Sequence, residues 1–145
     1  MEQSNVDKEI IMKLFVSKET LAERLTSIVD LSRGVIQIIQ DSGEILIESS
    51  GDLKNSEKIF LYLLGAYFAY KSGLRKGPQM PLGEISDRVG VPSTTIPAPM
   101  NGLIREKIVL KTEKGLYQIN FENYKNLRET MQKIRGKMIH SGGSK

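Results

Sequence analysis

Residues 82–120 read LGEISDRVGVPSTTIPAPMNGLIREKIVLKTEKGLYQIN, and the apolar pattern of this stretch decides the expected fold. Over residues 82–89 the apolar side chains recur at i, i+3 and i+7, which is the spacing of one helical face. Gly90 follows, where a helix end favours a residue that adopts a left-handed backbone. Helical spacing returns over residues 96–104 and then gives way to two short β-prone runs around Gly115. We therefore expect a helix, a turn, a second helix and a two-stranded hairpin.

This order of elements is that of a winged helix-turn-helix domain. The longest apolar segment of the chain, residues 57–72, precedes the stretch and is predicted to be the first helix and the core of the domain. A last helix is expected after Asn120, because an apolar stripe at helical spacing follows it. These boundaries predict a winged-helix domain with a C-terminal helix over residues 56–136 and a flexible tail over residues 137–145.

Residues 1–55 are predicted to form a small acidic α/β unit. The nearly continuous apolar run over residues 10–16 indicates a buried strand, although so short a run could instead be a helix, because its periodicity does not decide. Ser17 can cap a helix that stops before Gly34, and a hairpin signal follows over residues 35–47. The expected fold class is thus α+β: a winged helix-turn-helix domain preceded by a small β-α-β-β unit.

The composition is that of an ordinary globular chain of 145 residues, with 39% hydrophobic and 26% charged residues. No apolar run approaches the roughly 20 residues that span a bilayer, and the N-terminus lacks the pattern of a signal peptide. The sequence has no cysteine, which excludes disulfides and thiolate metal sites. We expect a cytoplasmic protein without a membrane partner.

The charge is divided unevenly along the chain. Residues 1–52 hold 5 basic and 10 acidic side chains, whereas the remainder holds 16 basic and 7 acidic ones, a net charge of +9. A strongly basic half favours a polyanionic partner. The alternative is that an acidic and a basic face attract each other across a domain or subunit contact.

The second helix of a helix-turn-helix presents its outward face to DNA. Here Asn101 and Arg105 are separated by four residues and share that face, and their side-chain types can read adenine and guanine edges. Hydroxyl groups before the helix can donate to phosphate, and nearby lysine and arginine side chains can neutralise it. The predicted DNA contacts are Arg75, Lys76, Arg88, Ser93, Thr94, Thr95, Asn101, Arg105, Lys107, Lys111 and Lys114.

Two prolines restrict the second helix. Proline inside a helix costs about 3 kcal/mol or more, so Pro97 and Pro99 fit only if the helix begins near residue 96 or 97. The helix is then short, near residues 97–107, and Gly102 weakens it by about 1 kcal/mol relative to alanine. The bare surface of Ala98 and Gly102 would let a phosphate chain or a protein backbone come close.

The pattern GEISDRVGVPSTTI…LIREKIV, followed by a glycine-turned hairpin, resembles winged helix-turn-helix domains of archaeal and bacterial transcription regulators. It looks closest to an uncharacterised archaeal family of transcription-regulator-like proteins with a small N-terminal domain. The resemblance covers about residues 56–135 and departs from the family at the IPAP stretch. It implies that the helix over residues 97–107 and the wing around Lys111 and Lys114 touch DNA.

Nothing in the sequence indicates an enzyme. The only histidine, His140, lies in the glycine-rich tail, and no nucleotide-binding or metalloprotease motif occurs. We expect no catalytic residues, no cofactor and no metal. The first hypothesis is a regulator or architectural protein that binds double-stranded DNA, with a homodimer formed through the acidic unit or the last helix. The second is a winged helix that contacts another protein in a transcription or other assembly.

Overall fold

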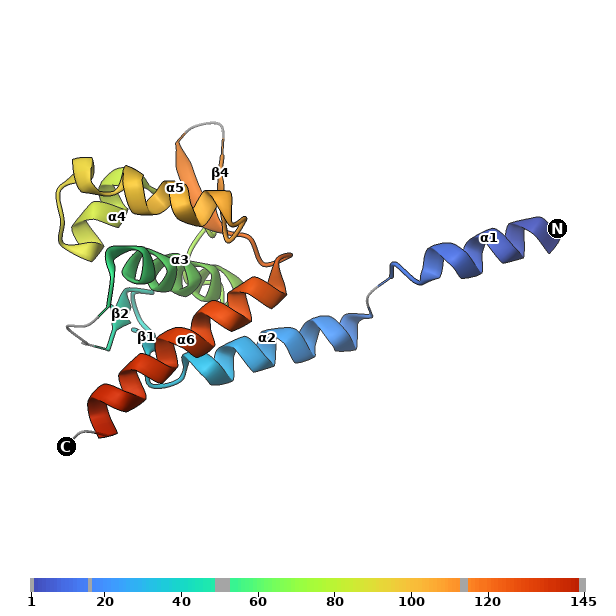
Figure 1. Ribbon diagram of the computed structural model, residues 1–145, viewed down its shortest axis with the longest axis horizontal. Coiled ribbons are helices and arrows are strands. Elements are labelled where there is room, and N and C mark those ends of the chain that lie inside the picture. The colour runs from blue at the N-terminus through green and yellow to red at the C-terminus, as the bar shows by residue number, and fades with distance from the viewer. Residues whose placement is uncertain (1, 16, 49–52, 113–114, 144–145) are drawn as a thin grey trace.

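The chain has an α+β architecture, seen in a computed structural model that describes residues 2–15, 17–48, 53–112 and 115–143 (Figure 1). A two-stranded sheet of β1 and β2 and a three-stranded sheet in the order β3-β5-β4 are both antiparallel. The described elements are α1 (Glu2–Met12), α2 (Lys18–Ser32), β1 (Ile36–Ile38), β2 (Ile45–Ile47), α3 (Asn55–Lys71), β3 (Met80–Pro81), α4 (Leu82–Val89), a 3-10 turn (Ser93–Thr95), α5 (Pro97–Arg105), β4 (Val109–Lys111), β5 (Leu116–Ile119) and α6 (Tyr124–Gly143).

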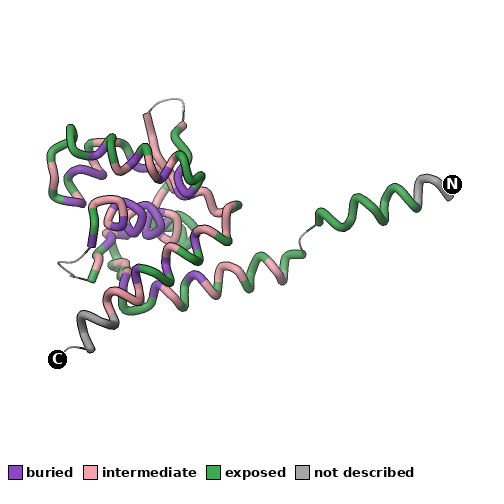
Figure 2. The backbone as a smooth tube through the Cα atoms, in the orientation of Figure 1, coloured by how far each residue is buried: buried purple, intermediate pink, exposed green. Residues whose placement is uncertain are grey.

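The helix α3 forms the centre of the molecule. It lies between α4 and α5 on one side and α2 and α6 on the other (Figure 1), and it is the most completely buried helix in Figure 2. Its side chains Ile59, Phe60, Leu63 and Leu64 are fully buried, as the apolar composition of residues 57–72 predicts. None of the helices in the described ranges is long and apolar enough to cross a membrane.

The β4–β5 hairpin lies at the sequence position predicted for it. Val109 is paired with Ile119 and Lys111 with Tyr117, and both Val109 and Ile119 are buried against the core. Gly115 adopts a φ of +71°, a backbone conformation that glycine adopts without steric cost. The short strand β3, which pairs with β5, was not predicted, because two residues give no detectable periodicity.

The predicted strand over residues 10–16 is wrong for the residues that the structure describes; residue 16 lies outside them. Residues 10–12 instead end the helix α1, and residues 13–15 form the turn that follows. The side chains of Ile10 and Phe15 are 56% and 68% exposed, so this apolar run is not buried. A helix satisfies its own backbone hydrogen bonds, whereas a strand here would need a pairing edge. The predicted helix and hairpin that follow are confirmed as α2 and β1–β2, so the unit has the order α-α-β-β.

The hydrophobic core is continuous across the predicted boundary between residues 55 and 56. Val35, Ile45 and Leu53 belong to the same buried cluster as the side chains of α3. Gly65 of α3 permits this packing, since a Cβ added there would lie 2.6 Å from Cγ2 of Ile45. The guanidinium of Arg135 in α6 also donates to the carbonyl oxygens of the residues that end α2, at 2.7 and 3.0 Å. The N-terminal unit therefore packs on the same central helix as the rest of the chain.

Candidate nucleic-acid interface

The outward face of α5 is exposed along its whole length. Ile96, Met100 and Leu103 turn inward and are buried, which fixes the opposite face toward solvent. Neither α5 nor the 3-10 turn before it contains an acidic residue. We call the outward residues the α5 face: Thr94, Thr95, Ala98, Asn101 and Arg105, all exposed.

The prolines are accommodated in the first turn of α5, as predicted. Pro97 is its first residue and Pro99 its third. The first four N–H groups of a helix have no intrahelical acceptor, so neither proline removes a hydrogen bond. The N–H of Met100 donates to the carbonyl of Ile96 at 3.0 Å. The helix ends at Arg105, two residues before the predicted end.

The turn that precedes α5 is anchored to α4. The hydroxyl group of Ser93 donates to Oγ of Ser86 at 3.2 Å, and Ser86 is buried in α4. The N–H of Thr95 donates to the carbonyl of Pro92 at 2.9 Å and closes the 3-10 turn. These bonds hold three exposed residues at the N-terminal end of α5: Ser93, Thr94 and Thr95.

Lys107 follows the C-terminal end of α5 in a strained conformation. Its φ is +61°, a left-handed value that costs a non-glycine residue about 1 kcal/mol or more. Its carbonyl accepts hydrogen bonds from the side-chain amides of Asn120 and Asn123, at 3.0 and 3.1 Å, which hold the backbone in place. Lys107 is thereby held with its side chain exposed beside the C-terminal end of α5.

The β4–β5 hairpin adds a further cation beside α5 (Figure 1). Lys111 is exposed, and its ammonium group lies 6.0 Å from the centre of the Tyr117 ring. Within the described ranges, no ion pair involves Arg105, Lys107 or Lys111. Lys114, also predicted to contact DNA, lies outside the described residues.

Two of the predicted DNA contacts are engaged within the protein. The guanidinium of Arg75 donates to both carboxylate oxygens of Glu84, at 2.9 and 3.0 Å, and to the carbonyl of Gln79 at 2.8 Å. Arg88 forms a 3.0 Å ion pair with Glu44. These pairs tie the loop after α3 and the residue that precedes β2 to α4. Lys76 is exposed on the same loop as Arg75.

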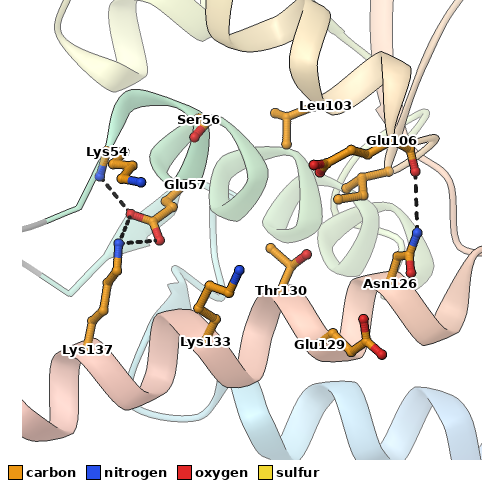
Figure 3. A pocket seen from close by; sticks show the side chains of 11 residues that line it. Lys54, Ser56, Glu57, Leu103, Glu106, Asn126, Glu129, Thr130, Lys133 and Lys137 are labelled. Carbon is orange, nitrogen blue, oxygen red and sulfur yellow. Dashed lines mark hydrogen bonds and ion pairs between the residues drawn. The ribbon is translucent and has the colours of Figure 1, made fainter.

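A cavity that the sequence does not predict lies on another side of α5 (Figure 3). It has a volume of about 650 Å³ between the first turn of α3, the C-terminal end of α5 and α6. Glu57 is buried there and accepts hydrogen bonds from the ammonium group of Lys137 at 2.8 and 2.9 Å. Three lysines and three glutamates line the cavity, so its formal charges balance. Because three distant segments build it, no local sequence pattern could reveal it.

Comparison of the chain with family models, curated proteins and solved structures gives no match. The described residues also contain no group of three or more side chains suited to hold a metal ion.

Proposed function

We propose that this protein is a winged helix-turn-helix DNA-binding protein of the cytoplasm, a transcription regulator or an architectural factor. The α3, α4 and α5 helices would form the three-helix core of the domain, and the β4–β5 hairpin would be its wing. The proposal extends the resemblance of residues 56–135 to archaeal and bacterial winged helix-turn-helix regulators.

One observation carries the proposal: α5 presents an exposed face free of acidic residues, and two exposed cations that form no ion pair within the described ranges lie past Glu106 at its end. Asn101 and Arg105 lie on this face, and Lys107 and Lys111 lie past its C-terminal end. The nine residues of α5 span about 14 Å, comparable to the roughly 12 Å width of the major groove. So short a helix can contact only a few base pairs.

The roles of these residues follow from their positions. Thr94 and Thr95, at the N-terminal end of α5, would donate to phosphate, where the helix dipole also favours an anion. Asn101 and Arg105 would face the base edges, and Lys107 and Lys111 would contact the backbone on the wing side. Because α2 and α6 lie on the other side of α3 (Figure 1), neither covers the α5 face.

The same surface also supports a second candidate function, contact with a protein partner. Ala98 is exposed, and a Cβ added to Gly102 would meet nothing within 4 Å. Small side chains at these two positions would allow a partner backbone to approach α5 closely. In that case the winged helix would serve a macromolecular assembly.

A titration with DNA separates the two functions. Fluorescence anisotropy of a random-sequence duplex at low and moderate salt should detect binding that weakens steeply as salt rises, because lysine and arginine side chains displace counterions. Absence of binding at low salt would reject the DNA function and favour the protein partner, which a pull-down with the Arg105→Ala variant as a comparison would then identify.

A further inference from the structure

The helix α1 carries apolar side chains that nothing in its own surroundings buries. It stands away from the body of the molecule (Figure 1) and is exposed over the part whose burial Figure 2 describes. Single exposed apolar residues are common, but a contiguous set indicates a binding surface. The exposed set, on α1 and the turn that follows it, has exposed fractions from 49% to 81% and consists of Val6, Ile10, Ile11, Met12, Leu14 and Phe15.

An apolar groove lies at the other end of α2. It has a volume of about 580 Å³ and is bounded by α2, β1 and the C-terminal end of α3. Val29 on its wall is 40% exposed, and Leu74 is 38% exposed. The apolar side chains that line the groove are Leu25, Val29, Ile36, Ile38, Phe68 and Leu74.

The two surfaces have complementary charge. The groove is lined by Arg33 and Lys71 and by no acidic residue. The sequence of α1, EQSNVDKEIIM, has three acidic residues and one basic residue. A docked α1 would place apolar side chains in the groove and its negative charge beside this basic rim, which favours the contact and its register.

We propose that α1 of a second copy of this chain docks in this groove, and that two copies exchange their α1 helices. The N-terminal end of α2 is fixed, since the N–H of Thr20 donates to Oγ of Ser17 at 3.0 Å. The helix α1 lies beyond that end of α2 (Figure 1). The groove begins at Leu25, about 12 Å further along the axis of α2 in the opposite direction. In this arrangement the helix is directed away from its own groove and is presented to another molecule.

A twofold axis completes the arrangement. Each copy would give one α1 and receive one, so the interface is isologous and closed. Two docked helices double the buried area of one contact, toward the roughly 1,000 Å² that a specific dimer needs. The groove and the α5 face lie on different sides of α3, so the dimer would leave both α5 faces open to two DNA half-sites.

Sedimentation velocity of the full chain over a range of concentrations tests the proposal in the absence of DNA. The wild type should form a dimer, and Ile10→Asp on α1 and Val29→Asp in the groove should each weaken it by at least about 30-fold. Leu110→Asp is the matched control, because Leu110 is 42% exposed on β4, outside both surfaces, and should leave the dimer unchanged. Circular dichroism would confirm that each variant is folded. A groove variant on the rim, Lys71→Glu, should also weaken the dimer.

Mixing the two aspartate variants tests the exchange itself. A mixed dimer pairs the intact α1 of the Val29→Asp chain with the intact groove of the Ile10→Asp chain, so one of the two contacts is restored. The mixture should associate at least about tenfold more tightly than either variant alone. A monomeric wild type, a dimer insensitive to Val29→Asp, or no recovery in the mixture would each overturn the proposal. None of these results depends on whether the protein binds DNA.

Discussion

At the scale of single residues, Lys107 connects stability with the proposed site. Its left-handed backbone is costly for lysine and free of steric cost for glycine. We expect Lys107→Gly to raise the free energy of unfolding by up to about 1 kcal/mol in urea denaturation, and to weaken DNA binding. Lys107→Ala is the control that separates the two effects: it removes the same charge and keeps the strain. Equal stability of the two variants would show that the conformation of residue 107 carries no strain.

A pH dependence is expected from Tyr67. Its ring stacks on Phe121 at a centroid distance of 4.8 Å, and burial, followed by the neighbouring Tyr70, raises the pKa of Tyr67 above 10.0. Because the pKa is higher in the folded state, the contribution of this phenol to stability is constant below about pH 10. This contribution to stability is lost as pH rises through the raised pKa of Tyr67 in the folded state.

Alkaline titration of tyrosinate absorbance measures this shift. The difference between the wild type and Tyr67→Phe should titrate above pH 10.0, the ordinary pKa of tyrosine, and the variant should lose less stability on the alkaline side of pH 10. A Tyr67 component that titrates at or below pH 10.0 would contradict the raised pKa of this phenol.

At the same scale, the sequence predicts side chains that follow local periodicity and misses those that depend on distant partners. The exposure of Asn101 and Arg105 follows from the buried positions of the same short helix. The ion pair of Arg88 joins it to Glu44, 44 residues away, and no spacing rule connects the two. Charge alone therefore could not distinguish cations that are held within the protein from those that are available to a ligand.

At the scale of elements, the packing of α3 on the β1–β2 hairpin depends on one glycine. The side chain of an alanine at position 65 would collide with the buried Ile45. We expect Gly65→Ala to lower the free energy of unfolding by about 1–2 kcal/mol, because overpacking outweighs the gain in helix propensity. Gly102→Ala is the matched control in an open position of α5, and should raise the free energy by up to about 1 kcal/mol. Urea denaturation measures both, and a neutral Gly65→Ala would contradict the close contact of α3 with β2.

Two elements illustrate why sequence prediction succeeded or failed. The short α5 was predicted because the positions of Pro97 and Pro99 leave only one place for a helix to begin. The apolar content of residues 10–16 favours a buried strand over the alternative of a helix, and yet the apolar side chains of its described residues 10–15 are exposed. Apolar composition indicates that a segment is suited to be buried, but it does not show whether the same chain or another molecule buries it. If the exchange of α1 takes place, a second copy provides that cover.

At the scale of the whole molecule, the uneven charge has two uses. Part of it joins the N-terminal acidic residues to the basic remainder, as in the ion pair of Arg88 with Glu44. One ion pair thus joins the two halves of the chain, whereas the alternative that whole acidic and basic faces attract each other stays a prediction. In the proposed function, Arg105, Lys107 and Lys111, which form none of the ion pairs found in the described residues, would provide the positive charge that contacts DNA.

The central claim, that the α5 face binds DNA, is tested most directly by the salt dependence of one variant. Arg105→Ala should weaken binding to duplex DNA and reduce the slope of log affinity against log salt by about one unit if the lost contact is to phosphate. A lost base contact would instead weaken binding to a preferred sequence selectively. Arg128→Ala, which removes an equal charge from the exposed surface of α6, should change neither quantity. Equal affinities and slopes for the folded wild type and Arg105→Ala protein would contradict the claim.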